Sequence, residues 1–223
     1  MQPRVYFVTG TDTGIGKTLC STLLLRAAAL NGKKAIGFKP VASEADSTGC
    51  NADVLSLQTA SNVCLPYTAH NCYTFREATA PHLAAVDEDV DIHPQVLSNG
   101  LAALKQQGDW ILVEGAGGWF TPLGSQVDFA DWVAAEKLPV IVIVGMKLGC
   151  INHAMLTVRA VLQAGLPLAG WVANCVDAAP HRFEDYLATL KARIPAPLLG
   201  VVPHAPSAEP QALLHYFSPS CLW

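Results

Sequence analysis

Short apolar stretches alternate along this chain with longer stretches in which Leu and Ala recur at helical spacing. A short apolar run between turn signals is typical of a buried strand, whereas apolar residues at every third or fourth position indicate a helix. The pattern predicts strands at residues 4–9, 35–38, 110–113, 140–144, 168–173 and 198–202. It predicts helices at residues 17–30, 53–59, 94–107, 128–137, 151–164 and 182–193, and a short helix near residues 211–216.

Two stretches lack this regularity. Residues 41–52 are polar and contain Gly, Ser and Asp, which predicts a loop. Residues 62–93 contain Pro66, Pro81 and several turn-forming residues, so we expect a loop with a short helix there.

Strands that alternate with helices predict right-handed crossover connections and a mainly parallel sheet. Several predicted strands are apolar without alternation, so helices should cover both faces of the sheet. We therefore expect a three-layer α/β/α fold, and 223 residues with 51% hydrophobic content suffice for a single domain over residues 1–223. Ligands of such sheets bind at the carboxyl ends of the strands.

Charge and composition argue against several partners and compartments. The net charge is −4 and no long run of Lys or Arg occurs, so we expect no nucleic-acid partner. The apolar stretch at residues 5–8 is too short for a signal peptide, and the one around residues 138–145 is too short to span a membrane. Seven cysteines without a CxxC pair disfavour a disulfide framework or a zinc site. These features predict a cytoplasmic protein with no membrane segment.

Residues 10–18 read GTDTGIGKT between a predicted strand and a predicted helix, the context that a phosphate-binding loop requires. The backbone amides of such a loop and the N-terminus of its helix bind phosphate oxygens. Lys17 would reach the β- and γ-phosphates, and the Thr18 hydroxyl would bind Mg²⁺. Five residues separate Gly10 from Gly16, one more than in the usual pattern. We interpret the chain as a nucleotide-binding enzyme of the P-loop NTPase type.

Three charged residues lie near predicted strand or helix ends. Lys39 follows the strand at residues 35–38 and could neutralise charge during phosphoryl transfer, or it could be a surface lysine before a turn. Glu114 follows an apolar strand and precedes a glycine-rich stretch, which is typical of a second Mg²⁺ anchor but also of a solvated strand end. Asp53 could bind the same ion, or it could cap a helix.

Six motifs occur in order along the chain. They are GTDTGIGKT at residues 10–18, FKPVAS at 38–43, VEGAGGWFTPL at 113–123, KLGCINHAMLT at 147–157, GWVAN at 170–174 and IPAPLLG at 194–200. Together they resemble the dethiobiotin synthase family of biotin biosynthesis, from about residue 4 to about residue 203.

The resemblance implies an ATP- and Mg²⁺-dependent ligase that converts 7,8-diaminopelargonate and CO2, or bicarbonate as its source, into dethiobiotin. One amine forms a carbamate with CO2, and ATP phosphorylates this carbamate to a carbamic–phosphoric anhydride. The second amine then attacks, a cyclic urea forms, and ADP and phosphate are released. The resemblance also implies a homodimer in which the substrate tail binds across the interface.

The same resemblance assigns catalytic and metal-binding roles. Lys39 and Lys17 would flank the carbamate and the γ-phosphate, with Lys39 as the residue that the family treats as catalytic. Thr18, Asp53 and Glu114 would hold Mg²⁺, partly through water. Two lysines and a divalent ion suit a site that must hold two mutually repelling anions together.

Further residues would bind the substrate and the nucleotide. The diamine would be contacted by Ser43 and Thr13, and its tail carboxylate by Cys150, Ile151, Asn152 and Tyr186. Asn174 would read the adenine edge, with Glu209 a candidate for the ribose. The remaining nucleotide contacts would be Thr13, Gly14, Ile15, Gly16, Leu19, Gly115, Ala116, Gly117, Cys175, Pro203, His204 and Ala205. Gly14 stands where some members of the family carry an acidic residue.

Other P-loop proteins offer competing interpretations. A nucleotide-switch ATPase of the partition or nitrogenase-iron-protein type shares the fold but usually has an extra lysine near the front of the loop, where this chain has Asp12 and Thr13. A small-molecule kinase usually closes an arginine-rich lid, and an amidase-coupled synthetase would be longer. A switch would hydrolyse ATP without any diamine, which separates it from the ligase.

Overall fold

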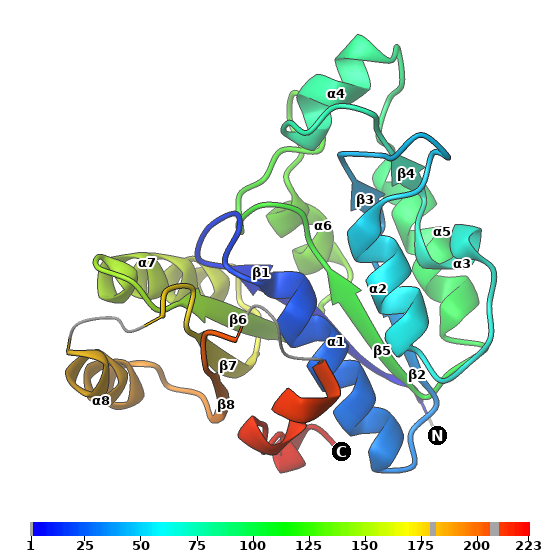
Figure 1. Cartoon of the computed structure of the whole chain (residues 1–223). Helices are drawn as coiled ribbons and strands as arrows, with labels where there is room; N and C mark the ends of the chain where they lie inside the picture. Colours follow the sequence, from blue (N-terminus) through cyan, green and yellow to red (C-terminus); the bar gives the residue numbers. More distant parts are fainter. Residues whose placement is uncertain (1, 179–181, 206–209) are drawn as a thin grey trace.

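A parallel six-stranded sheet forms the centre of the molecule (Figure 1). The computed structural model describes residues 2–178, 182–205 and 210–223. The strand order is β2-β5-β1-β6-β7-β8, and every neighbouring pair in it is parallel. The strands are β1 (Arg4–Gly10), β2 (Ala35–Phe38), β5 (Trp110–Glu114), β6 (Val140–Gly145), β7 (Leu168–Asn174) and β8 (Leu198–Val202). Each agrees with its predicted range to within one residue.

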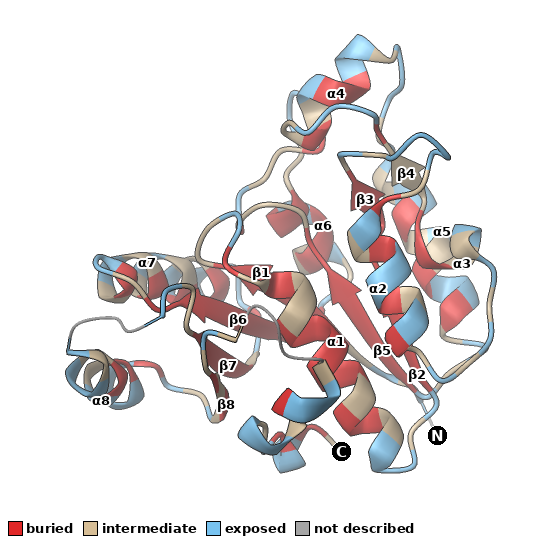
Figure 2. Ribbon diagram, viewed as in Figure 1, coloured by how far each residue is buried: buried red, intermediate tan, exposed pale blue. Residues whose placement is uncertain are grey.

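Helices cover both faces of this sheet, and the strands between them are almost entirely buried (Figure 2). One apolar cluster joins one face to α1 (Lys17–Leu30), α2 (Ala52–Ala60) and the 3₁₀ helices η1 (Pro210–Tyr216) and η2 (Ser220–Leu222). A second cluster joins the other face to α4 (Pro81–Asp87), α5 (Pro94–Leu104), α6 (Phe129–Ala135), α7 (Cys150–Gln163) and α8 (Phe183–Arg193). The predicted three-layer α/β/α fold is confirmed.

The irregular stretches hold more structure than their sequence predicts. Within the predicted loop 41–52, β3 (Val41–Ala42) pairs in parallel with β4 (Tyr73–Thr74). The stretch 62–93 contains two short helices, α3 (Tyr67–His70) and α4, instead of one. The helix predicted near 211–216 is a 3₁₀ helix. Such short elements have no room for a hydrophobic period, so the pattern could not distinguish them from loops.

The strand order determines where the chemistry can lie. β2, β5 and β1 are adjacent, and because they are parallel their carboxyl ends meet at one edge of the sheet. The glycine loop follows β1, Lys39 follows β2, and Glu114 ends β5. Within the described ranges, no helix combines the length and apolar character that a bilayer crossing needs.

Candidate active site

The conformation of the glycine loop depends on the backbone of Gly16 and on a side chain from the end of β7. Gly16 caps α1 in the left-handed region, with φ of 80°. Asn174 donates a hydrogen bond from its Nδ2 to the carbonyl oxygen of Ile15 at 2.7 Å. A Cβ atom placed on Gly16 would lie only 2.3 Å from that same Nδ2. Glycine is therefore required here both for its φ and for the close approach of Asn174.

Lys17 lies inside the loop at the start of α1. Its side chain is buried, and its Nζ donates a hydrogen bond to the carbonyl oxygen of Asp12 at 3.1 Å. Burial lowers the pKa of Lys17, and the opposing effect of the Glu114 charge does not restore it. A desolvated ammonium beside backbone amides is suited to receive phosphate oxygens.

Lys39 lies between two carboxylates. Its Nζ is 2.5 Å from Oδ2 of Asp53 and 2.8 Å from Oε1 of Glu114. Burial by itself would lower the pKa of Lys39, but the charges of Glu114 and Asp53 outweigh it, so the pKa is raised. Burial likewise would raise the pKa of Asp53, but the charge and hydrogen bond of Lys39, together with Thr18 and Lys17, outweigh it and the pKa is lowered. The pair is therefore an ammonium and a carboxylate at neutral pH.

These contacts decide between the alternatives left open by the sequence. Lys39 is 5% exposed and Glu114 is fully buried, so neither is a solvated residue at a strand end. The N-cap of α2 is Asn51, whose side chain accepts hydrogen bonds from the backbone N–H groups of Asp53 and Val54. Asp53 is therefore not the cap, and its carboxylate is free to bind Lys39.

The oxygen atoms around Lys39 suit a hard divalent cation. The hydroxyl of Thr18 donates a hydrogen bond to Oε1 of Glu114 at 2.8 Å, and Oε2 of Glu114 is buried with no partner among the described residues. Mg²⁺ is usually bound by one or two carboxylates together with waters and substrate phosphates. In the described part of the chain, no group of three or more His, Cys, Asp or Glu forms a metal cage by itself. Thr18, Asp53 and Glu114 thus fit a Mg²⁺ ion that nucleotide phosphates would complete.

A cleft of about 860 Å³ opens above these residues. Its lining includes Thr13, Gly14, Gly16, Lys17, Thr18, Lys39, Ser43, Asp53, Ala116 and Gly117. Sequence reasoning missed a second group of lining residues, which come from the turn after β3, from the segment entering α4 and from the loop after β5. They are Glu44, Ala78, Thr79, Ala80, Pro81, Gly118, Phe120, Thr121 and Pro122. The glycine-rich stretch after Glu114 was the available signal for the loop after β5.

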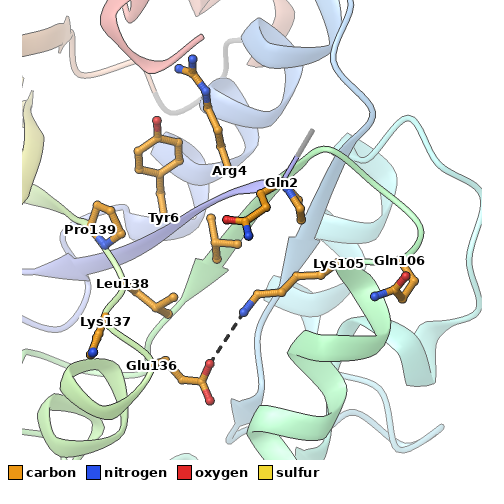
Figure 3. A pocket seen from close by; sticks show the side chains of 11 residues that line it. Gln2, Arg4, Tyr6, Lys105, Gln106, Glu136, Lys137, Leu138 and Pro139 are labelled. Atoms are coloured by element: carbon orange, nitrogen blue, oxygen red, sulfur yellow. Dashed lines mark ion pairs between the residues drawn. The ribbon is translucent and has the colours of Figure 1, made fainter.

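Another cavity, of about 630 Å³, lies at the opposite end of the sheet (Figure 3). Arg4 at the start of β1, Lys105 and Glu136 are among its lining residues, and Lys105 and Glu136 form an ion pair at 3.7 Å. Parallel α/β sheets bind ligands at the carboxyl ends of their strands, and this cavity lies at the amino end of β1. The cleft beside the glycine loop is therefore the candidate active site.

Comparisons with known proteins identify the family of this chain. The model of the AAA domain family AAA_26 matches residues 4–212. The chain is 57% identical over 201 residues to the ATP-dependent dethiobiotin synthetase BioD 1 of Salmonella typhi, covering 89% of this chain and 88% of that protein. Identity to the corresponding protein of Escherichia coli (strain K12) is 55%, with 89% of each chain covered. The chain belongs to the ATP-dependent dethiobiotin synthetase family.

Solved structures with low sequence identity share the fold of this dethiobiotin synthetase family member. A ParA family ATPase from Chlorobium tepidum TLS has a TM-score of 0.52 at 16% identity, covering 97% of this chain and 91% of that one. The signal recognition particle receptor FtsY from Elizabethkingia anophelis, in complex with GDP, also has a TM-score of 0.52, at 15% identity. The match covers all of this chain but only 63% of the receptor. At these identities the likeness extends to the P-loop fold alone.

The residues predicted to hold the substrate tail lie in a different place from the cleft. Cys150, Ile151, Asn152 and Tyr186 line a groove of about 490 Å³ around the start of α7. Among described residues, the groove and the Lys39 cleft have no lining residue in common. The groove at the start of α7 and the cleft beside Lys39 are therefore separate cavities within one subunit.

The residues predicted to contact the nucleotide follow the carboxyl ends of three strands. Asn174 ends β7, and the backbone N–H of Cys175 donates to the carbonyl oxygen of Val202 at the end of β8. Pro203, His204 and Ala205 follow β8 directly, so they share the edge of the sheet with the glycine loop. Leu19 lies in the first turn of α1, and Gly115 follows β5. Glu209 lies outside the described residues.

Sequence reasoning also missed an ion pair that holds the first residues of the glycine loop. Nζ of Lys147, which follows β6, lies 2.7 Å from Oδ2 of Asp12, whose Oδ1 accepts from the backbone N–H of Thr13. The Lys147 hydrogen bond and the Thr13 backbone bond lower the pKa of Asp12. The two residues are 135 positions apart, so no local pattern could have paired them.

Proposed function

We propose that this protein catalyses the ATP-dependent carboxylation and ring closure of 7,8-diaminopelargonate with CO2, giving dethiobiotin, ADP and phosphate. The observation that carries the proposal is Lys39, held as an ammonium between Asp53 and Glu114 beside a phosphate-binding loop. Family membership supports the same reaction, and the proposed unit is a single ligase domain over residues 1–223.

The chemistry requires two anions to react. A carbamate is a poor electrophile, because oxide would be its leaving group, and phosphorylation provides a better one. The carbamate and the γ-phosphate repel each other, so the site must supply positive charge between them. In the proposed arrangement Lys17 binds the phosphates, and Lys39, which is charged and nearly buried, faces the carbamate.

A Mg²⁺ ion is the proposed cofactor, with Thr18, Asp53 and Glu114 as its protein ligands. Bound with ATP, it would neutralise charge on the β- and γ-phosphates. Two observations support this assignment. Oε2 of Glu114 has no hydrogen-bond partner among the described residues, and the Thr18 hydroxyl donates to Oε1 of the same carboxylate.

The diamine is proposed to lie in the cleft against Thr13 and Ser43, with its tail carboxylate at the start of α7. The Oγ of Ser43 is buried and has no partner among the described residues, which leaves it able to bind an amine or a carbamate. Because the α7 groove is separate from the cleft, we propose a homodimer in which the groove of one subunit receives the tail bound in the other. Exposed Leu148 and Leu156 on this side of α7 favour burial against a second copy.

The adenine and ribose contacts, with Asn174, Cys175 and residues 203–205, stay predictions, as do the cytoplasmic location and the absence of nucleic-acid or membrane partners. The nucleotide-switch ATPase is not better supported, because the structures of that type match this chain in fold alone. Asp12, where such switches carry a lysine, pairs instead with Lys147.

The proposal is tested with purified protein, Mg-ATP, bicarbonate and diaminopelargonate, leaving out one component at a time. We expect dethiobiotin, detected by mass spectrometry, only in the complete mixture, and phosphate release that depends on the diamine and bicarbonate. If the complete mixture yields no cyclic urea, the ligase assignment is wrong. If phosphate release is the same without the diamine, the switch interpretation takes its place.

A further inference from the structure

The backbone of Lys39 is held from both sides by the end of α3. The backbone N–H of Lys39 donates to the carbonyl oxygen of His70 at 2.8 Å, and Nδ2 of Asn71 donates to the carbonyl oxygen of Lys39 at 2.7 Å. The same Nδ2 donates to the carbonyl oxygen of Tyr73 at 3.0 Å. Since carbonyl oxygens only accept, the amide of Asn71 has one orientation, with its Oδ1 facing away from Lys39.

Two hydroxyl groups extend this hydrogen-bond network from Oδ1 of Asn71. The hydroxyl of Thr74 donates to Oδ1 of Asn71 at 2.7 Å, which uses its single hydrogen. The hydroxyl of Tyr67, 3.0 Å from Thr74 Oγ1, must therefore donate to it. The oxygen of Tyr67 in turn accepts from the backbone N–H of Asn51 at 3.0 Å. Every proton in this series has one assignment.

The series ends at the residues that position Asp53 and Ser43. Oδ1 of Asn51 accepts from the backbone N–H of Asp53 at 3.0 Å and so begins α2, while its Nδ2 donates to the carbonyl oxygen of Ser43 at 2.6 Å. Asn51 is 5% exposed and Asn71 is 8% exposed, so their hydrogen bonds have little competition from water.

We infer that Asn51, Tyr67, Thr74 and Asn71 form a relay that sets the position of Lys39 against Asp53 and Ser43. None of the four contacts Nζ of Lys39, so they are positioning residues and not catalytic ones. The inference rests on the proposed function, in which Lys39 and Asp53 act on the carbamate and the phosphates. The relay connects the backbones of two residues whose side chains meet at 2.5 Å, although they are 14 positions apart.

The relay should act on turnover more than on nucleotide binding. A displacement of about 1 Å from the reactive geometry can cost about 100-fold in rate. The glycine loop is held by other contacts, from Asn174 and Lys147, which the relay does not include. Breaking the relay should therefore lower kcat and leave the KM for ATP almost unchanged.

The experiment removes hydroxyl groups one at a time. We expect Tyr67→Phe and Thr74→Val to lower kcat about tenfold, with the KM for ATP within about twofold of the unaltered protein. Thr74→Ser, which keeps the hydroxyl, should retain kcat within about twofold. Tyr73→Phe is the matched control, because among the described residues the Tyr73 hydroxyl binds only the backbone N–H of His93 at 3.2 Å, outside the relay.

A second measurement does not depend on activity. An amine-acylating reagent followed by mass spectrometry gives the rate at which Lys39 is modified, with Lys105 as internal reference. We expect Lys39 to react about fivefold faster in Tyr67→Phe and Thr74→Val, because its ion pairs are displaced, and at the original rate in Tyr73→Phe.

The outcomes separate the two proposals. If the unaltered protein makes no dethiobiotin, the proposed function fails, and the acylation rates still test the relay. The relay is wrong if Tyr67→Phe and Thr74→Val leave both kcat and the acylation rate of Lys39 unchanged. It is also wrong if Tyr73→Phe changes them as much as Tyr67→Phe, since that would be a general loss of packing.

Discussion

The two lysines of the site are buried in different electrostatic surroundings. Lys39 has carboxylates at 2.5 and 2.8 Å, and these overcome the cost of burial and raise its pKa. Lys17 has no carboxylate partner within ion-pair distance among the described residues, and burial lowers its pKa. Lys17 therefore has unsatisfied attraction for an anion, whereas Lys39 must exchange protein carboxylates for substrate oxygens.

The charge of Lys39 should be essential to turnover. We expect Lys39→Ala to lower kcat by about 100-fold or more, the size of effect seen when a transition-state charge contact is lost. Dethiobiotin formation at saturating substrates measures this. Lys105→Ala is the control, since Lys105 pairs with Glu136 at the remote cavity, and it should keep full turnover. Equal turnover of Lys39→Ala and the unaltered protein would remove Lys39 from its role.

Substitution of Gly16 should be tolerated less well than substitution of Gly14, although both residues lie in the left-handed region. A Cβ on Gly16 would clash with Asn174, whereas a Cβ on Gly14 would meet nothing within 4 Å. We expect Gly16→Ala to reduce the free energy of unfolding by about 3 kcal/mol and to abolish ATP binding. Gly14→Ala should cost about 1 kcal/mol, from backbone strain alone. Urea titration compares the two, and equal losses would contradict a steric role for Asn174.

At the scale of elements, the glycine loop is braced by neighbouring segments. Asp12 pairs with Lys147 after β6, and Ile15 accepts from Asn174 at the end of β7. The backbone N–H of Gly145 donates to the Thr11 hydroxyl at 3.3 Å. These contacts connect the nucleotide loop to the segment that leads into α7.

The Asp12–Lys147 pair should stabilise the protein in a pH-dependent way. The pKa of Asp12 is lowered in the folded state. The ionised Asp12 therefore contributes its full share to the stability of the fold above its ordinary pKa of 3.8, and this contribution is lost as pH falls through the lowered pKa. Because both side chains are more than a third exposed, Asp12→Asn should cost only about 0.5 kcal/mol at pH 7. Urea titrations at several pH values measure the difference between the two proteins. A difference that grew on acidification would contradict the pairing.

The sequence predicts the central elements well and the connections between distant residues poorly. Parallel strands buried on both faces are apolar throughout, so the pattern located all six, and Lys39 and Glu114 could be assigned to strand ends. The role of Asp53 stayed open between metal ligand and helix cap, because aspartate is a good capping residue and the cap, Asn51, is known only from the structure. The contact of Tyr67 with Asn51 depends on how α3 packs, which no local period encodes.

At the scale of the whole molecule, the proposed homodimer shares its substrate site between two subunits.

 The Lys39 cleft and the α7 groove share no lining residue among the described residues, and the α7 side carries Leu148, which is 86% exposed, and Leu156, which is 60% exposed. In the proposed homodimer a two-fold axis would relate each surface to its copy, so one contact would complete two sites at once.

Two variants that are each inactive should therefore restore activity when mixed. Lys39→Ala disables the cleft. Asn152→Asp, which is nearly isosteric, places a negative charge at the start of α7, where it would repel the substrate carboxylate. In a hybrid dimer, the intact cleft of the Asn152→Asp subunit faces the intact α7 of the Lys39→Ala subunit. Equal mixing should then give about a quarter of the original turnover at low diamine concentration, because about half of the dimers are hybrids with one working site each.

The oligomeric state provides the control for this complementation. Leu156→Glu added to both variants should shift the protein toward monomer in sedimentation velocity and abolish the restored turnover, because a charge would be buried in the interface. Leu30→Glu is the matched substitution, since Leu30 is 71% exposed at the end of α1, away from the α7 groove, and it should leave the hybrids active. The shared arrangement is contradicted if the monomeric Leu156→Glu proteins still show restored turnover. It is also contradicted if a stable mixed dimer shows no restored turnover. Either result would place the tail site within a single subunit.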